Sequence, residues 1–243
     1  MNLSVIIPTF NRFEALQNAI KSVVSQIDKN SEIIVINDGS TEENYYKVKY
    51  NNAQIRQINL KVNQKLKNGF SADAIRNIGS SEAKGKYIGF LDDDDIWLPG
   101  KIETQLAALE KSNNKISCTE GYYGLGFYEK NKKYSLYNQK HFYKQISVKY
   151  KNTKFKNKKR FKKFEFPSIF NSEFIEIHNC IVTSSVIVEN SVFKQVGMFD
   201  PSLPNGVGDY DCWKKIMLTT DCEYIKKPLF YYDGLHAGLQ NYK

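Results

Sequence analysis

The chain has 243 residues, 41% of them apolar and 25% charged, a composition typical of a folded globular domain rather than a disordered tail. A mean hydropathy of −0.51 and the lack of an apolar run near ~18 residues argue against a membrane-spanning helix. The four cysteines form no C-x-x-C pair, which argues against a zinc ribbon or a dithiol redox motif and favours reduced, buried thiols.

The net charge of +9 comes from one segment of the chain. Residues 129–166 contain thirteen lysines and Arg160 against Glu129 and Glu165, a net charge of +12, which leaves the rest at about −3. An inference about acidic partners therefore applies to this segment and not to the fold. The opening MNLSVIIPTF has no basic region before its apolar stretch, so we expect no signal peptide and a cytoplasmic location.

The first hundred residues alternate β-branched runs with amphipathic stretches, which predicts βα units and a mostly parallel sheet with helices on both faces. Strands are expected at residues 3–7, 33–37, 55–60 and 86–91. Pro8 should end the first strand. Asn11 followed by Glu14 resembles a capping box, so a helix should start there, and another should start near Ser71.

Asp38 and the three residues after it predict a turn that offers caps for another helix, and Pro99 should open a helix through Leu109. The chain after this helix is less regular. Regular alternation stops after Gly126. A strand is expected at residues 180–188 and a helix at 209–218.

Four consecutive aspartates, Asp92 to Asp95, follow the strand at 86–91. Ligands bind at the carboxyl edge of open α/β sheets, so their position makes them a candidate site. Adjacent carboxylates repel one another unless a cation offsets the charge, and hard oxygen ligands suit Mg²⁺ or Mn²⁺. In an extended chain Asp92 and Asp94 would converge on one ligand while Asp93 and Asp95 face elsewhere. The alternative is a solvated turn that caps the next helix, which we disfavour for four aspartates.

The chain resembles a family-2 glycosyltransferase with the GT-A fold. The resemblance rests on SVIIPTFNR, EIIVINDGST, NGFSADAIRNIGSSEAKGKYIGFLDDDDIWLPGK and GMFDPSLPNGVGDYDCW, which occur in the family's order and cover more than half the chain. It implies a single GT-A domain over residues 1–243. Residues 1–100 would bind the nucleotide-sugar, and residues 101–243 would shape the acceptor site.

The resemblance also implies roles for individual residues. The nucleotide-binding residues would be Pro8, Thr9 and Asn11 at the base, Asp38 at the uracil or ribose, and Arg76 facing the nucleotide. The family's D-x-D motif maps onto Asp92, Asp93 and Asp94, with Asp94 as metal ligand and Asp92 or Asp93 at the ribose. His236 would approach the diphosphate or the metal, although a lone histidine is more often a surface residue.

Asp209 matches the aspartate that serves the family as general base, and its alternative role is to cap the helix that follows. Gly208 stands where the family has a glutamate, which puts the acceptor contacts of that side chain in doubt. The implied reaction is a metal-dependent, inverting transfer of one sugar from a nucleotide diphosphate to a saccharide or lipid-linked saccharide. The implied setting is bacterial surface polysaccharide synthesis.

The basic segment mixes lysines with aromatic residues, as at a membrane interface, where it would bring the enzyme to an anionic lipid surface. The alternative is a solvated loop in the acceptor half, and nucleic acid is disfavoured because no binding motif accompanies the segment. Two other functions remain open: a sugar-nucleotide pyrophosphorylase, and a nucleotide-sugar-binding protein without turnover. The first lacks the expected glycine-rich loop after the first strand, and Gly208 is the hint for the second.

Overall fold

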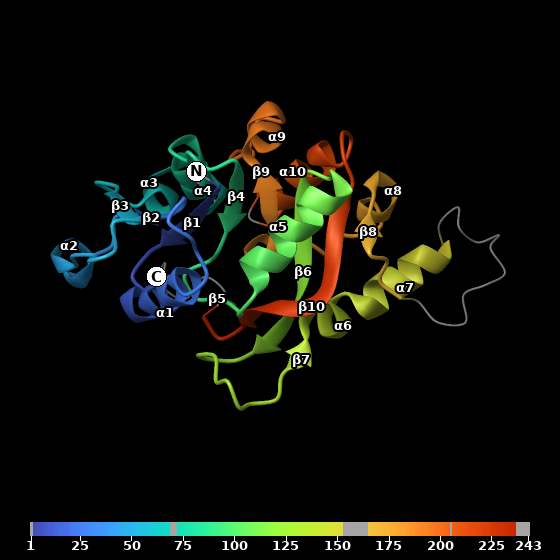
Figure 1. Ribbon diagram of the computed structural model, residues 1–243, viewed down its shortest axis with the longest axis horizontal. Helices are drawn as coiled ribbons and strands as arrows, with labels where there is room; N and C mark the ends of the chain where they lie inside the picture. Colours follow the sequence, from blue (N-terminus) through green and yellow to red (C-terminus); the bar gives the residue numbers. More distant parts are fainter. Residues whose placement is uncertain (1, 69–71, 153–164, 205, 237–243) are drawn as a thin grey trace.

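The computed structural model describes residues 2–68, 72–152, 165–204 and 206–236, and its described part is built around one twisted sheet (Figure 1). The sheet contains ten strands. The strands are β1 Leu3–Thr9, β2 Ser31–Asn37, β3 Ile55–Asn59, β4 Tyr87–Phe90, β5 Ile96–Trp97, β6 Ile116–Gly124, β7 Ser135–Leu136, β8 Ile169–Phe170, β9 Ile187–Glu189 and β10 Cys222–Asp233.

The sheet order is β3-β2-β1-β4-β9-β6-β10-β5, with β7 paired to β6 and β8 to β10. The long ladders are parallel: β3, β2, β1 and β4 form one parallel half, and β6 with β10 forms another. Strand β9 lies antiparallel between the halves. The α/β fold with a mostly parallel sheet is therefore confirmed, as is the placement of its first four long strands to within one or two residues.

Helices cover both faces of the sheet, in order α1 Phe13–Val24, α2 Asn44–Lys47, α3 Gln64–Asn68, α4 Ala72–Ser81, α5 Lys101–Ser112, α6 Tyr137–His141, α7 Tyr143–Asn152, α8 Ser172–Ile175, α9 Asn190–Gln195 and α10 Gly208–Ile216. A short 3₁₀ turn, η2, spans Thr183–Ser185. One face packs on α1 and α5, and the other packs on α4, α9 and α10. Figure 1 shows α5 crossing in front of β6.

Alternation along β1 divides its side chains between these two cores. Val5 and Ile7 pack with Leu16 of α1, while Ile6 packs with Ile75 of α4. All seven residues of β1 are buried, as expected for a strand covered on both faces. The strand is thereby fixed between two layers of helix, and its carboxyl end is held in one place.

The structure corrects two expectations at the end of β1. The strand continues through Pro8 to Thr9, because Pro8 lies beyond the last pairing with β4, where a missing amide proton is tolerated. Asn11 does not cap α1: the cap position is Arg12, which makes no side-chain capping bond. Asn11 has a left-handed φ of 49°, and its side-chain oxygen accepts instead from the backbone of Thr41 at 2.8 Å.

Two further corrections concern the second half of the chain. The expected strand at 180–188 does not form as one strand: Thr183–Ser185 form η2, and only Ile187–Glu189 joins the sheet. Hydroxyl groups at Thr183, Ser184 and Ser185 bond locally or into the site, which competes with a ladder. The long strand β6 has no counterpart in the sequence prediction, because its ISCTEGYYG run contains polar residues and glycine. The helix expected at 209–218 is confirmed as α10.

The described part of the basic segment forms β7, α6 and α7, while residues 153–164 lie outside the described residues. Ser71, near which a helix was expected to start, also lies outside them, and α4 is described from Ala72. Among the aromatic side chains described in the basic segment, Phe166 is 4% exposed, and Phe142 and Tyr143 pack against the core. All four cysteines are buried and unpaired. Where the structure describes the chain, its helices are too short or too polar to cross a bilayer.

Candidate active site at the carboxyl edge of the sheet

The loops after β1 and β2 meet at the carboxyl edge of the sheet. The amide of Asp38 donates to the carbonyl of Thr9 at 2.9 Å, and the amide of Asn11 donates to Ser40 Oγ at 3.0 Å. The hydroxyl of Thr9 shares a 2.6 Å hydrogen bond with Tyr45. Pro8, Thr9, Asn11 and Asp38, expected to hold a nucleotide, therefore lie together on this edge, as parallel strands dictate.

Asp38 is 2% exposed, and the residues that follow β3 hold it in place. Its Oδ1 accepts from the amide of Gln64 at 2.8 Å, and its carbonyl accepts from Asn63 Nδ2 at 3.0 Å. Gly39 follows with a φ of 70°, and a Cβ there would lie 2.6 Å from Asn63 N. Glycine is required at this turn because both its left-handed backbone and its close neighbour exclude a side chain.

The four aspartates lie in a loop between β4 and β5, and Trp97 of β5 packs against this loop's supporting residues. The Trp97 ring packs against Gly89, its Nε1 donates to the carbonyl of Ser184 at 2.8 Å, and it is 1% exposed. Ser184 Oγ accepts from the amide of Asp92 at 3.1 Å. Trp97 is thus a packing residue, and η2 supports the loop through Ser184.

Arg12 binds the acidic loop, and sequence reasoning gave it no role. Its Nη2 lies 2.5 Å from Asp93 Oδ1, and its Nη1 lies 2.6 Å from Asp94 Oδ2. Nη1 also donates to the carbonyl of His236 at 2.9 Å. One guanidinium therefore ties the β1 loop, the acidic loop and the segment after β10 together, and it offsets two carboxylate charges. Arg12 is the last residue of SVIIPTFNR, and its place in that stretch was the available signal.

Asp92, Asp94 and Asp95 each place a carboxylate oxygen within 4.8 Å of the others. Burial raises the pKa of Asp94 to about 7, the charges of Asp93 and Asp92 add to the rise, and Arg12 opposes it. Burial and the charges of Asp94 and Asp92 also raise the pKa of Asp95. Crowded hard oxygen donors that resist ionisation together are a set that a divalent cation would stabilise, so these residues fit Mg²⁺ or Mn²⁺.

The convergence of Asp92 and Asp94 is as predicted, but the expectation that Asp95 faces elsewhere is wrong, and its alternative role as a helix cap is not seen either. Asp95 is 1% exposed, and its Oδ1 accepts from the amide of Asp233 at 3.1 Å. Helix α5 begins later, after Gly100. A long-range backbone bond to β10, which no local pattern reveals, turns Asp95 toward its neighbours.

His236 lies beside the acidic loop, outside the group of three carboxylates. Its Nδ1 is 2.6 Å from Asp233 Oδ2, and its ring stacks on Phe127 with centroids 5.5 Å apart. Its contact with Arg12 is through the backbone carbonyl. The histidine as a metal ligand stays a prediction. His141 packs between Tyr123 and Tyr137.

Arg76 lies behind the acidic loop, 7% exposed, between two carboxylates. Its Nη2 donates to Asp92 Oδ1, and its Nη1 donates to Asp73 Oδ1 at 2.8 Å. The charges of Asp92 and Asp73 raise the pKa of Arg76 against the effect of burial. Arg76 therefore remains charged and links α4 to the loop.

Asp209 lies in the first turn of α10, while the cap position is Val207. Its Oδ2 accepts from Thr183 Oγ1 at 3.2 Å, and its Oδ1 accepts from the amide of Tyr210 at 2.6 Å. Burial raises the pKa of Asp209 to about 6, with the charge of Asp73 adding to the rise and Arg76 opposing it. A carboxylate with this pKa is ionised at neutral pH and remains able to accept a proton.

Tyr137 of α6 faces both parts of the site. Burial raises the pKa of its phenol, and the charges of Asp95 and of Asp209 add to this rise. Its ring also packs on Tyr232 of β10, with centroids 4.8 Å apart. Tyr137 of the basic segment therefore lies within electrostatic reach of both the acidic loop and Asp209.

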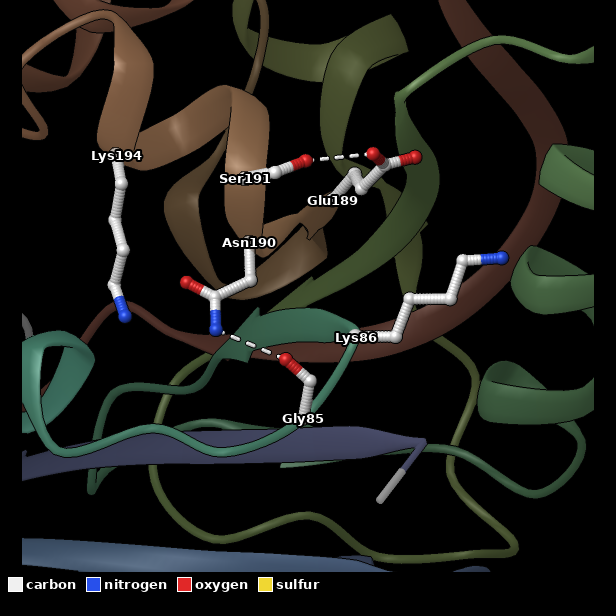
Figure 2. Close-up of a pocket in the computed structure, with 6 residues that line it drawn as sticks. All are labelled: Gly85, Lys86, Glu189, Asn190, Ser191 and Lys194. Carbon is white, nitrogen blue, oxygen red and sulfur yellow. Dashed lines mark hydrogen bonds between the residues drawn. The ribbon is translucent and has the colours of Figure 1, made fainter.

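Figure 2 shows a different cavity of about 340 Å³ at the opposite edge of the sheet, where β4 begins and β9 ends. Its polar groups bond to one another: Asn190 Nδ2 donates to the carbonyl of Gly85 at 2.9 Å, and Ser191 Oγ donates to Glu189 at 2.6 Å. The candidate nucleotide, metal and base residues all lie at the other edge.

Comparison with known proteins shows what the chain resembles. The family model for glycosyl transferase family 2 matches residues 4–190. An uncharacterized glycosyltransferase of Rickettsia prowazekii is 31% identical over 97% of the chain, and the chain covers 64% of it. The GalNAc(5)-diNAcBac-PP-undecaprenol beta-1,3-glucosyltransferase of Campylobacter jejuni is 39% identical over 46% of the chain and 34% of that protein. The chain thus spans about two thirds or less of these relatives.

Among solved structures, S. aureus TarS in complex with UDP-GlcNAc matches with a TM-score of 0.69 at 16% identity. The match covers 100% of this chain and 61% of that one. At this identity the likeness establishes the fold, and it confirms the expected GT-A architecture.

We expect the raised pKa of Asp209 to make stability depend on pH. Its pKa is about 6 in the folded chain against an ordinary 3.8, so between these values the folded state binds more protons than the unfolded state, and stability falls as pH rises. Asp209→Asn removes this cost. The variant should be about 1–2 kcal/mol more stable than the parent at pH 7.5, allowing for partial exposure, with no difference near pH 4.

Urea denaturation at both pH values measures this difference. Asp221→Asn, at an exposed aspartate, is the matched control and should change stability little at either pH. An advantage of Asp209→Asn that is equal at pH 4 and pH 7.5 would contradict the raised pKa.

Proposed function

The chain belongs to glycosyl transferase family 2, and from this premise we propose that it transfers a sugar from a nucleotide diphosphate to a hydroxyl of a saccharide acceptor. The observation that carries the proposal is the placement of the Asp92, Asp94 and Asp95 group and of Asp209 around Arg76 at one edge of the sheet. Leaving-group stabilisation and proton removal from the acceptor are the two demands of this reaction.

We propose a uridine diphosphate sugar as donor. The relative WfgD of Escherichia coli is named as a UDP-Glc transferase and the structural neighbour was solved with UDP-GlcNAc, so both point to this nucleotide. Pro8, Thr9, Asn11 and Asp38 would receive the base and ribose, with Asp93 or Asp92 completing the ribose contacts. Asp38 and Thr9 are held by backbone bonds and so are ordered before a donor arrives, which limits the entropy lost on binding.

Asp94, with Asp92 and Asp95, would hold Mg²⁺ or Mn²⁺ beside the diphosphate, where the ion would stabilise the charge that develops on the departing phosphate oxygens. Arg12 contributes a positive charge next to Asp94 and keeps the loop from opening under its own repulsion. His236, adjoining Arg12, is a candidate for a further contact with the diphosphate.

Asp209 would accept the proton of the acceptor hydroxyl as it attacks the anomeric carbon from the face opposite the leaving group, which inverts that carbon. Thr183 orients the carboxylate by donating to Oδ2. General-base catalysis of this kind typically contributes ~10²–10⁴-fold. The relatives from Campylobacter jejuni and Escherichia coli are named for undecaprenol diphosphate-linked saccharides, which supports a lipid-linked saccharide acceptor and a role in polysaccharide biosynthesis.

The metal and donor sites are testable by thermal shift. We expect Mn²⁺ with UDP or a UDP-sugar at ~100-fold over Kd to stabilise the protein by roughly 2.7 kcal/mol, and Asp94→Asn to remove most of this gain. Ser191→Ala, at the opposite edge of the sheet, should retain it. An equal shift in Asp94→Asn would rule out Asp94 as a ligand.

The reaction itself is testable with a panel of labelled UDP-sugars and an undecaprenol diphosphate-linked saccharide. We expect Asp209→Asn to lower kcat by about 10²–10⁴-fold while donor binding stays within a few fold, because only the proton acceptor is lost. Unchanged transfer in this variant would exclude Asp209 as the base. Pyrophosphate release from a sugar 1-phosphate and a nucleoside triphosphate would indicate a pyrophosphorylase instead, and donor binding without transfer a binding protein.

We also propose that the basic segment contacts an anionic membrane face at the cytoplasmic surface, where a lipid-linked acceptor would be found. Lys130, Lys133, Lys144 and Lys149 are exposed on it, and each lysine near anionic lipid contributes ~1 kcal/mol. Replacing these four by glutamine should weaken sedimentation with phosphatidylglycerol vesicles by at least tenfold. The same change at Lys29, Lys49, Lys61 and Lys84, also exposed, is the control. Equal loss in both sets would contradict a localised contact.

A further inference from the structure

Gly208 is buried beside Asp209, and the space for a side chain at this position is already filled. A Cβ added to Gly208 would lie 2.4 Å from Asp73 Oδ2 and 3.1 Å from the carbonyl of Asp200. The φ of Gly208 lies outside the left-handed region, so the backbone does not require glycine here. The position is restricted by the carboxylate of Asp73, which comes from α4 and not from α10.

Asp73 is itself 4% exposed and lies in the first turn of α4. Its Oδ1 accepts from Arg76 Nη1 at 2.8 Å, while the other terminal nitrogen of Arg76 donates to Asp92. A buried carboxylate is retained at a cost unless it is paired, and here it is paired with Arg76, whose guanidinium also supports the acidic loop. Asp73 therefore fixes Arg76 from the side opposite Asp92.

Asp209 is bounded by charged and titratable groups from several elements. Asp73 and Arg76 of α4 act on it with opposite sign, and Cys212 of α10 and Tyr137 of α6 also lie within its electrostatic reach. Among these groups Asp73 has the larger effect on Asp209. The row Asp92, Arg76, Asp73 and Asp209 thus connects the acidic loop to the proposed base.

We propose that Asp73 is a positioning residue of the transfer site: it fills the side-chain space of position 208 with a carboxylate, holds Arg76 against Asp92 and faces Asp209. This inference rests on the proposed function, since it assigns Asp73 a task in the same reaction. Removal of the Asp73 charge would release one end of Arg76, which would then be free to pair with Asp209 and neutralise it. A merely structural Asp73 would affect folding and leave the titration of Asp209 unchanged.

The isosteric variant Asp73→Asn tests this role. We expect the acid limb of kcat/KM against pH to move down by about one unit and kcat to fall about tenfold, with KM for the donor little changed. The pKa of Asp209 is followed independently by carbon-13 NMR of labelled aspartate, its signal assigned with Asp209→Asn. It should fall from about 6 by a similar amount. Ser191→Ala should leave both readouts at the parental values.

A relocation of the carboxylate provides the second test. Gly208→Asp alone places two carboxylates in one space and should lower both stability and kcat. Combined with Asp73→Ala, the aspartate at 208 can occupy the vacated space, and kcat should recover at least tenfold over Asp73→Ala alone. Either result indicates that a carboxylate is required in that space, whichever of the two positions supplies it.

An Asp73→Asn protein with a parental pKa for Asp209, in which only the melting temperature falls, would overturn the inference. Failure of the double variant to exceed Asp73→Ala would also count against it. These outcomes are separate from failure of the proposed function. A parent chain that transfers no sugar refutes the function, whereas the NMR titration still reports whether Asp73 controls Asp209.

Discussion

The structure depends on the placement of four adjacent carboxylates at the buried end of β4. Such a cluster is electrostatically unfavourable, and the chain stabilises it with two guanidinium groups from different elements. Arg12 contacts Asp93 and Asp94 from the β1 loop, and Arg76 contacts Asp92 from α4. Arg76 is held by burial and its bond to Asp73, and Arg12 by its bond to the carbonyl of His236, so the loop keeps one conformation although its own charges favour opening. A divalent ion would complete the neutralisation that these two residues begin.

The rest of the fold can be understood as support for this edge. Parallel strands bring the loops after β1, β2 and β4 to one side, where Thr9, Asp38 and the acidic loop adjoin. On the other side of the site, η2 contacts both parts: Ser184 accepts from the amide of Asp92, and Thr183 donates to Asp209. One short turn therefore sets the relative position of the proposed metal ligands and the proposed base. Raised pKa values at Asp94 and Asp209 indicate that stability is lost to keep them buried.

Local rules succeeded where local physics decides the outcome. Strands with unbroken β-branched runs and the amphipathic helices α1, α5 and α10 were predicted because burial on one face leaves a periodic pattern. The rules failed where a distant partner competes with a neighbour. Asn11 bonds to Thr41 instead of capping α1, and Asp95 accepts an amide of β10 and converges on Asp92 and Asp94 instead of facing elsewhere. Strand β6 was missed because its pairing partners, and not its composition, make it a strand.

The sequence by itself determined the α/β order, the acidic cluster at a strand end, and the candidate residues Pro8, Thr9, Asn11, Asp38 and Asp209, because each is set by short-range pattern or by a family motif. Tertiary structure alone decided which charged side chains pair with one another. Arg12 and Asp94 are 82 residues apart, and Asp73 comes from α4 to fill the space beside Gly208 of α10. Such pairings depend on how helices and loops pack over the sheet, and packing is a property of the whole chain that no local run of residues records.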